Sequence, residues 1–115
     1  MTTCAAMADS GCLFVYITMP DKASALSYCE TLVRERFVAC ANILDGATSV
    51  YWWQDTLESG TECVCILKTT RERYPAFLAR AKETHPYEVP CIVAWPIAAG
   101  NEDFLSWIYS ETMSR

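Results

Sequence analysis

The segment 50–70, VYWWQDTLESGTECVCILKTT, predicts a β-hairpin and constrains the fold more than any other part of the chain. Positions 50–53 carry β-branched and aromatic side chains, as is typical of a strand in a half-buried sheet. Residues 54–56 interrupt this apolar run, and Asp55 can adopt the left-handed conformation of a tight hairpin turn. The return strand is expected over residues 57–69, with Gly60 as a bulge or bend.

This return strand is longer than a domain of this size can pair. At about 3.3 Å per residue its span is roughly 43 Å, whereas strands in globular domains usually contain about 3–10 residues. The excess could bend at Gly60, fray into solvent or pair with another chain. We expect it to pair with another chain.

The composition fits a single folded domain over residues 11–115, preceded by a flexible tail at residues 1–10. Of the 115 residues, 52% are hydrophobic and 20% are charged, as in ordinary globular proteins. The net charge of −5 argues against non-specific binding to nucleic acid or to an anionic membrane. Seven cysteines without a recognisable secretory signal indicate free thiols in a reducing cytoplasm.

Apolar segments place the remaining strands and the first helix. Strands are predicted at residues 12–18, 37–53 and 89–97, and Asp45-Gly46 is expected to bend the second of them. A helix over residues 22–36 follows Asp21, which is a suitable N-cap. The expected buried face of this helix consists of Leu26, Cys29, Val33 and Phe37.

Two more helices complete the domain. The second begins near residue 71 or 72, so that Pro75 falls in its first turn, and it ends before Pro86. Asn101 is the expected cap of the last helix. The residues expected to pack inward from that helix are Phe104, Leu105, Trp107 and Ile108. The order β-α-β-β-α-β plus a terminal helix predicts an α+β ferredoxin-like sandwich.

The strands are apolar on both faces, although two helices can cover only one face of the sheet. On the return strand Cys63, Cys65 and Leu67 point one way, while Val64 and Ile66 point the other. An open apolar face of this size is rare in soluble monomers. We therefore expect copies of the same chain to cover it.

His85 is the only histidine, and it is the first candidate for a metal ligand. Imidazole is the commonest protein ligand for copper, zinc and nickel. The alternative is a structural histidine that bonds the last carbonyls of the second helix. One histidine is too few for a closed metal site.

The cysteine pair Cys63 and Cys65, and Lys68, could likewise be either binding residues or structural residues. Cys63 and Cys65 share one face of a strand and could bind a soft metal, but burial as small apolar side chains is the favoured interpretation. Lys68 near the end of an apolar strand either pairs with a surface carboxylate or belongs to a polar-aromatic pocket. The candidate partners in that pocket are Glu62, Glu88, Trp52 and Trp53.

The sequence contains no nucleophile elbow, phosphate-binding loop, dinucleotide fingerprint or metalloprotease helix. The sequence offers no Ser/His/Asp set around its one histidine, so we expect no catalytic triad and no enzymatic activity. An RNA-recognition domain shares the element order, but ECVCILKTT lacks its basic aromatic motif and the net charge is negative.

Four segments resemble the CutA divalent-cation tolerance family: RERFVACANILDGATSVYWW, ECVCILKTT, HPYEVP and FLSW. The resemblance extends over residues 13–107 and is most specific in HPYEVP and in the Tyr-Trp-Trp hairpin. It implies a ferredoxin-like homotrimer in which long hairpin strands pair with neighbouring subunits. It also implies a protein of the response to metal ions, binding copper(II) or another divalent cation.

The resemblance further implies a ligand set of one first-strand cysteine and two adjacent histidines. Ile17 and Thr84 occupy two of these positions and only His85 matches, so weak metal binding is expected. A pocket between subunits could add Tyr87, Glu88 or Cys40. The alternative function is a trimeric small-molecule sensor of the PII type, with Lys68 as the partner of an anionic ligand bound between subunits.

Overall fold

The computed structural model describes residues 9–113. Its elements are β1 (Cys12–Met19), α2 (Lys22–Arg34), β2 (Cys40–Trp53), β3 (Thr56–Thr70), α3 (Tyr74–Glu83), β4 (Ile92–Pro96) and α4 (Glu102–Thr112). This confirms the predicted order of strands and helices. Within the described residues, no helix combines the length and apolarity needed to cross a membrane.

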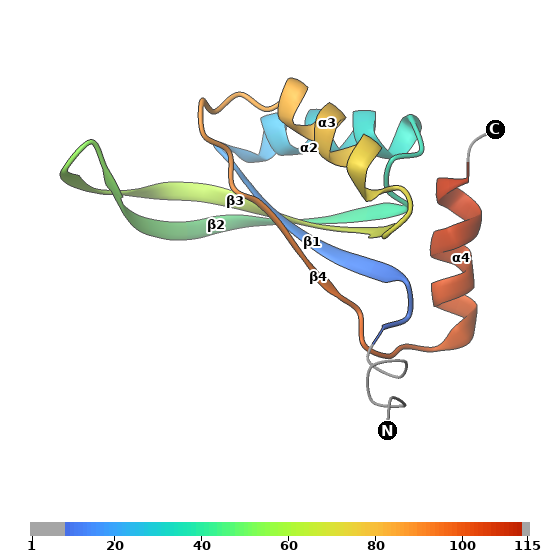
Figure 1. Cartoon of the computed structure of the whole chain (residues 1–115). Coiled ribbons are helices and arrows are strands. Elements are labelled where there is room, and N and C mark those ends of the chain that lie inside the picture. The colour runs from blue at the N-terminus through green and yellow to red at the C-terminus, as the bar shows by residue number, and fades with distance from the viewer. Residues whose placement is uncertain (1–8, 114–115) are drawn as a thin grey trace.

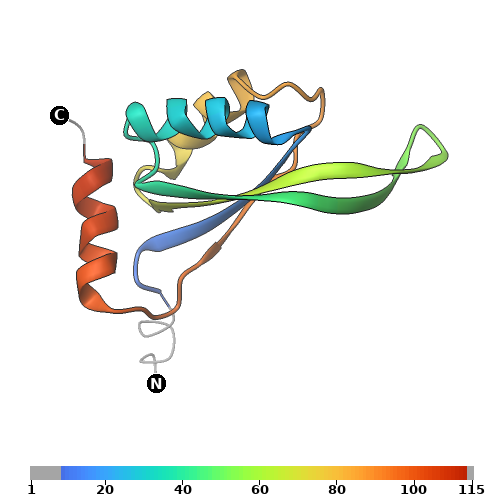
Figure 2. The ribbon, with the colours of Figure 1, turned by 180° about the vertical axis from the view of Figure 1, so that it is seen from behind.

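The strands form one antiparallel sheet in the order β2-β3-β1-β4. Helices α2 and α3 lie on one face of this sheet, and α4 stands at one end of it (Figure 1). The hairpin of β2 and β3 extends away from the helices in both views (Figure 1, Figure 2). The chain is therefore an α+β fold with a projecting arm.

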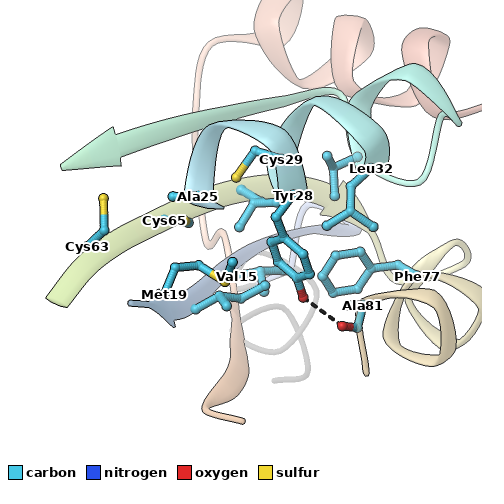
Figure 3. Close-up of a cluster of buried hydrophobic side chains, with 13 residues drawn as sticks. Val15, Met19, Ala25, Tyr28, Cys29, Leu32, Cys63, Cys65, Phe77 and Ala81 are labelled. Carbon is cyan, nitrogen blue, oxygen red and sulfur yellow. Dashed lines mark hydrogen bonds between the residues drawn. The ribbon is translucent and has the colours of Figure 1, made fainter. Parts of the chain in front are cut away.

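The hydrophobic core lies between the sheet and the helices α2 and α3 (Figure 3). Its fully buried members include Ile17 from β1, Leu67 from β3, Leu32 from α2 and Phe77 from α3. Cys63 and Cys65 are also fully buried in it. The interpretation of these two cysteines as core residues is confirmed.

The buried face of α2 differs from the predicted one. Residues Ala25, Tyr28, Cys29 and Leu32 are buried, whereas Leu26 is 49% and Val33 36% exposed. Both sets have helical spacing, so the sequence pattern alone could not choose between them.

The ends of α2 are fixed by local hydrogen bonds. Asp21 accepts a bond from the Ser24 N–H at 2.8 Å, which confirms the predicted N-cap. The helix ends at Arg34, two residues before the predicted end, because Arg36 adopts a left-handed φ of 67°. The N–H groups of Arg36 and Phe37 then bond the carbonyls of Val33 and Leu32, as in a Schellman motif.

The hairpin is confirmed, but its bulge is not where it was predicted. Gln54 and Asp55 both have positive φ, of 51° and 65°, which makes a type I′ turn. The register shifts between Leu44 and Ala47, around Gly46 at φ 83°. Gly60 instead pairs with Ser49 in continuous register, so the prediction of a bulge or bend there was wrong.

N-terminal to Cys63, β3 has no partner in its own sheet except β2. β1 pairs with β3 only as far as Met19 opposite Cys63, and residues 56–62 pair with β2 alone. The predicted excess of strand length is therefore present. Its pairing with another chain stays a prediction.

The sheet face opposite α2 and α3 is apolar, and we call it the open face. It is defined by the alternating residues Phe14, Tyr16, Val64, Ile66, Val93 and Trp95. Phe14 stacks on Trp95 with ring centroids 5.2 Å apart, and Trp95 remains 46% exposed. The prediction that copies of the chain cover this face remains open to test.

The C-terminal half departs from expectation at two elements. β4 is shorter than the predicted strand 89–97. In α4 only Ile108 of the expected inward residues is fully buried, and Leu105 is partly buried. Phe104 and Trp107 stack on each other at 5.6 Å and are 39% and 40% exposed, so their predicted inward packing was wrong.

The start of α3 and the N-terminal tail can also be compared with their predictions. α3 begins at Tyr74, two or three residues after the predicted start near residue 71 or 72, and Pro75 lies in its first turn as expected. Residues 1–8 of the predicted tail lie outside the described residues. Its last two residues, Asp9 and Ser10, bond the side chain of Arg71 and the backbone of Ile97.

Candidate functional site

A cleft lies at the hairpin end of the open face, between the β2–β3 arm and the segment 86–91. Its volume is about 780 Å³, within the range of roughly 300–1,000 Å³ typical of small-molecule sites. Alternation along β2 points Ser49, Tyr51 and Trp53 into it from one side. Other lining residues include Tyr16, Glu62, Tyr87, Glu88 and Cys91.

Glu62 on β3 joins the two walls of the cleft. Its carboxylate accepts a hydrogen bond from the Ser49 hydroxyl at 2.6 Å and another from the Tyr87 hydroxyl at 2.7 Å. Burial and the hydrogen bond to Glu62 raise the pKa of Tyr87, which therefore remains a donor at neutral pH. The arm and the segment 86–91 are thus connected through one carboxylate.

His85 lies directly behind the wall formed by the segment 86–91 and is only 8% exposed. Its Nδ1 accepts the Tyr87 backbone N–H at 3.1 Å, so the ring proton belongs on Nε2, which donates to the Thr18 carbonyl at 2.9 Å. Burial lowers the pKa of His85, and the Thr18 hydrogen bond and the Glu62 charge act against that change. A metal ion could reach a ring nitrogen only by replacing one of these two hydrogen bonds.

Within residues 9–113, no three histidine, cysteine, aspartate or glutamate side chains are arranged to hold a metal ion. Ile17 is fully buried in the core, and the Thr84 hydroxyl donates to the Arg80 carbonyl at 2.9 Å. Neither residue therefore offers an unengaged metal-ligand atom beside His85. His85 as a metal ligand stays a prediction, and neither Ile17 nor Thr84 provides a second ligand for it.

The predicted pocket residues divide into two groups. Glu62, Trp53, Tyr87 and Glu88 all line the cleft. Trp52 does not, and it is 71% exposed because neighbouring strand residues point to opposite faces.

Lys68 is also absent from the lining of this cleft. It shares the face of Glu62 but lies six residues further along β3, about 20 Å away at strand spacing. Its ammonium contacts the Asn42 side chain and lies 5.7 Å from the Phe14 ring centroid, on the open face. An anion-binding pocket with Lys68 would therefore need groups from a neighbouring chain.

Sequence reasoning missed several residues of the cleft. Ser49 and Tyr51 could have been found, because their spacing of two from Trp53 places them on its face of the strand. Tyr16 and Cys91 carried no such signal, since their proximity depends on the pairing of β1 with both β3 and β4. Burial and the nearby Glu62 raise the pKa of the Cys91 thiol, which keeps it protonated.

Comparison with known proteins extends over nearly the whole chain. Residues 13–111 match the family described as CutA1 divalent ion tolerance protein. A divalent-cation tolerance protein CutA from Thermus thermophilus is 43% identical over 98 residues, which are 85% of this chain and 95% of that protein. Its counterpart from Pyrococcus horikoshii is 40% identical over 100 residues, covering 87% of this chain and 97% of that protein.

Solved structures agree with this match. The crystal structure of CutA1 from Ehrlichia chaffeensis superposes with a TM-score of 0.86 at 32% identity, covering 90% of this chain and 97% of that one. The structure of the periplasmic divalent cation tolerance protein CutA from Archaeoglobus fulgidus superposes with a TM-score of 0.85 at 34% identity, covering 89% of this chain and 99% of that one. The resemblance seen in the sequence is confirmed, and the chain belongs to the CutA1 divalent ion tolerance protein family.

Proposed function

We propose that this protein serves tolerance to divalent metal ions, as a cytoplasmic homotrimer with a ferredoxin-like subunit and without catalytic turnover. The observation that carries the proposal is the match of residues 13–111 to a family whose members are named for this function. Free thiols support a reducing compartment, since all six cysteines in the described part of the chain are unpaired.

The projecting arm and the open face support the assembly. Residues 56–62 of β3 have only β2 beside them, and the open face exposes Val93 by 49% and Trp95 by 46%. Exposed apolar surfaces and unpaired strand edges of this kind are usually buried by a partner. Three copies around a shared axis would bury the open faces against one another.

Metal binding is proposed at His85, with copper(II) or another borderline divalent cation as ligand. Imidazole suits these ions, and the Glu62 carboxylate is close enough to influence the titration of the ring. Binding at Nδ1 would break the hydrogen bond from the Tyr87 N–H. This loss makes the affinity weak, because the partly buried N–H would lose its partner.

Copper(II) binding tests this site directly, because the chain has one histidine. Pulsed electron paramagnetic resonance should detect the remote nitrogen of a single imidazole bound to copper(II), and His85→Ala should abolish this signal. Calorimetric titration should show a matching loss of affinity. Glu83→Gln, at the exposed end of α3, is the control and should leave both measurements unchanged. Wild-type protein without an imidazole signal would refute the site.

The oligomer is tested separately by light scattering coupled to size exclusion. The expected particle has three times the chain mass of 12.9 kDa. A stable particle of 12.9 kDa would contradict the proposed assembly whatever the copper experiment shows.

A further inference from the structure

We propose that Cys29 on α2 and Cys65 on β3 form a redox-sensitive pair, which closes to a disulfide inside the core when the protein meets a hydroperoxide. Both cysteines are free thiols in the same core cluster, 3% and 0% exposed. The Cys29 thiol donates a hydrogen bond to the Cys65 sulfur, so the two sulfurs are in direct contact. Figure 3 shows both residues in the cluster, with Cys63 further along β3. This contact carries the proposal.

The pair belongs to one protomer whatever the assembly. Cys65 pairs across the sheet with Ile17 and Ile43, and all three point to the face that α2 and α3 cover. The open face is the opposite side of the sheet. Copies that bury the open face therefore neither separate the two sulfurs nor bring another group between them.

The hydrogen bond makes the two thiols unequal. The donated proton raises the pKa of Cys29 and lowers the pKa of Cys65, and burial acts to raise both. Cys65 is therefore the first of the pair to form the thiolate, which is the reactive species in thiol oxidation. A disulfide carries no charge, so the apolar core can accept it as the product. A metal ion fits less well, because the described residues provide no group of three ligands.

A groove on the helix side gives a small oxidant a route to the pair. It lies between α2 and β2, has a volume of about 340 Å³ and is lined by Cys29 together with Leu26, Val33 and Ile43. Hydrogen peroxide is uncharged and little larger than water, so these apolar walls do not exclude it. One sulfur is oxidised to the sulfenic acid with release of water, and the second thiol then attacks that sulfur and releases another water. The pair thus loses two protons and two electrons to one peroxide molecule.

Closing the disulfide would move α2. The S–S bond is about 2.0 Å long, shorter than any hydrogen-bond contact between thiols, so Cys29 must approach β3. Its neighbour Tyr28 bonds the Ala81 carbonyl and lies edge-on to His85 with ring centroids 5.3 Å apart. Oxidation is therefore expected to shift the His85 ring. An effect on metal binding at His85 rests on the proposed function, whereas the disulfide itself does not.

Peptide mapping tests the disulfide. The full chain is treated with hydrogen peroxide in the presence of a chelator, alkylated, and digested with trypsin without reduction. Cys29 falls in the tryptic peptide 23–34, and Cys40, Cys63 and Cys65 fall in the peptide 37–68. The native protein should give these two peptides linked, with fragmentation placing the link between Cys29 and Cys65, and dithiothreitol should reverse it. The chain oxidised in guanidinium chloride should instead distribute its links among all its cysteines.

Cys63 supplies the matched control, because it is fully buried on the same face of β3. Cys65→Ala should abolish the link, and Cys63→Ala should leave its yield unchanged. If either variant fails to fold, the fragmentation pattern of the wild-type peptide still distinguishes Cys63 from Cys65. A native protein without the link, or with the distribution of the unfolded chain, would overturn the proposal.

Proton NMR of the one histidine tests the effect on His85. Its imidazole signals should shift when the wild-type protein is oxidised and should stay in place when Cys65→Ala is oxidised. Unchanged wild-type signals would overturn the coupling between the pair and His85. Both measurements use metal-free protein, so their outcome is independent of the copper experiment.

Discussion

Removing the Tyr28 hydroxyl should destabilise the protein more than removing any exposed tyrosine hydroxyl. The carbonyls in the last turn of a helix lack intrahelical donors. At the end of α3, the Arg80 carbonyl accepts from Thr84 and the Lys82 carbonyl from His85. The Ala81 carbonyl accepts instead from the Tyr28 hydroxyl on α2, at 2.7 Å (Figure 3). This bond therefore connects the two helices inside the core.

The magnitude follows from burial. Tyr28 is 6% exposed and Ala81 is fully buried, so water cannot replace the lost donor in Tyr28→Phe. An unsatisfied buried carbonyl costs about 1–3 kcal/mol. The ring, which lies edge-on to His85 with centroids 5.3 Å apart, is kept in this variant. We therefore expect a loss of about 1–2 kcal/mol in the free energy of unfolding.

Tyr109→Phe is the matched control. Its hydroxyl is 3.5 Å from the Ser10 carbonyl, and the residue is 39% exposed, so the expected change is below about 0.5 kcal/mol. Both variants should be unfolded in guanidinium chloride at one protomer concentration, because association contributes to apparent stability. A Tyr28→Phe variant within 0.5 kcal/mol of wild type, roughly the limit for surface changes, would refute the reasoning.

Three further substitutions test the backbone and the core. Gly46→Ala should cost about 1–2 kcal/mol in denaturant unfolding because the backbone φ at Gly46 is 83°. Gly60→Ala should be neutral in the same assay, since the strand register at Gly60 is regular and no atom would lie within 4 Å of an added Cβ. Asp21→Ala should lose about 1 kcal/mol with its cap bond, measured by thermal melting, and Asn101→Ala, which has no side-chain cap bond, should change little. Phe77→Ala should cost about 3–5 kcal/mol by calorimetry, and a smaller loss would mean that the fully buried site collapses around the cavity.

The sequence predicted the elements well because their signals are local. Turn residues mark the hairpin at Gln54 and Asp55, and the Asp21 cap marks the start of α2. The phase of α2 was not predictable in this way. Leu26 and Leu32 each belong to a set of apolar residues with helical spacing, and only the shape of the sheet decides that Leu32 is buried and Leu26 is half exposed.

The bulge shows the same limit in the strands. A glycine indicates where a strand can accept an extra residue, and both Gly46 and Gly60 qualified. The choice depends on how two strands align over their whole length, which is a property of the pair. Which residues share a face was predictable within a single strand, as for Trp53 on β2 or Glu62 on β3. Which residues of different strands lie close together in the cleft was not predictable.

His85 connects the proposed metal site to the wall of the cleft through a single hydrogen bond. Its Nδ1 accepts the Tyr87 N–H, and the Tyr87 hydroxyl donates to Glu62 on β3. A metal ion at Nδ1 would break the first of these bonds, so metal binding at His85 is expected to disturb the position of Tyr87 against the arm.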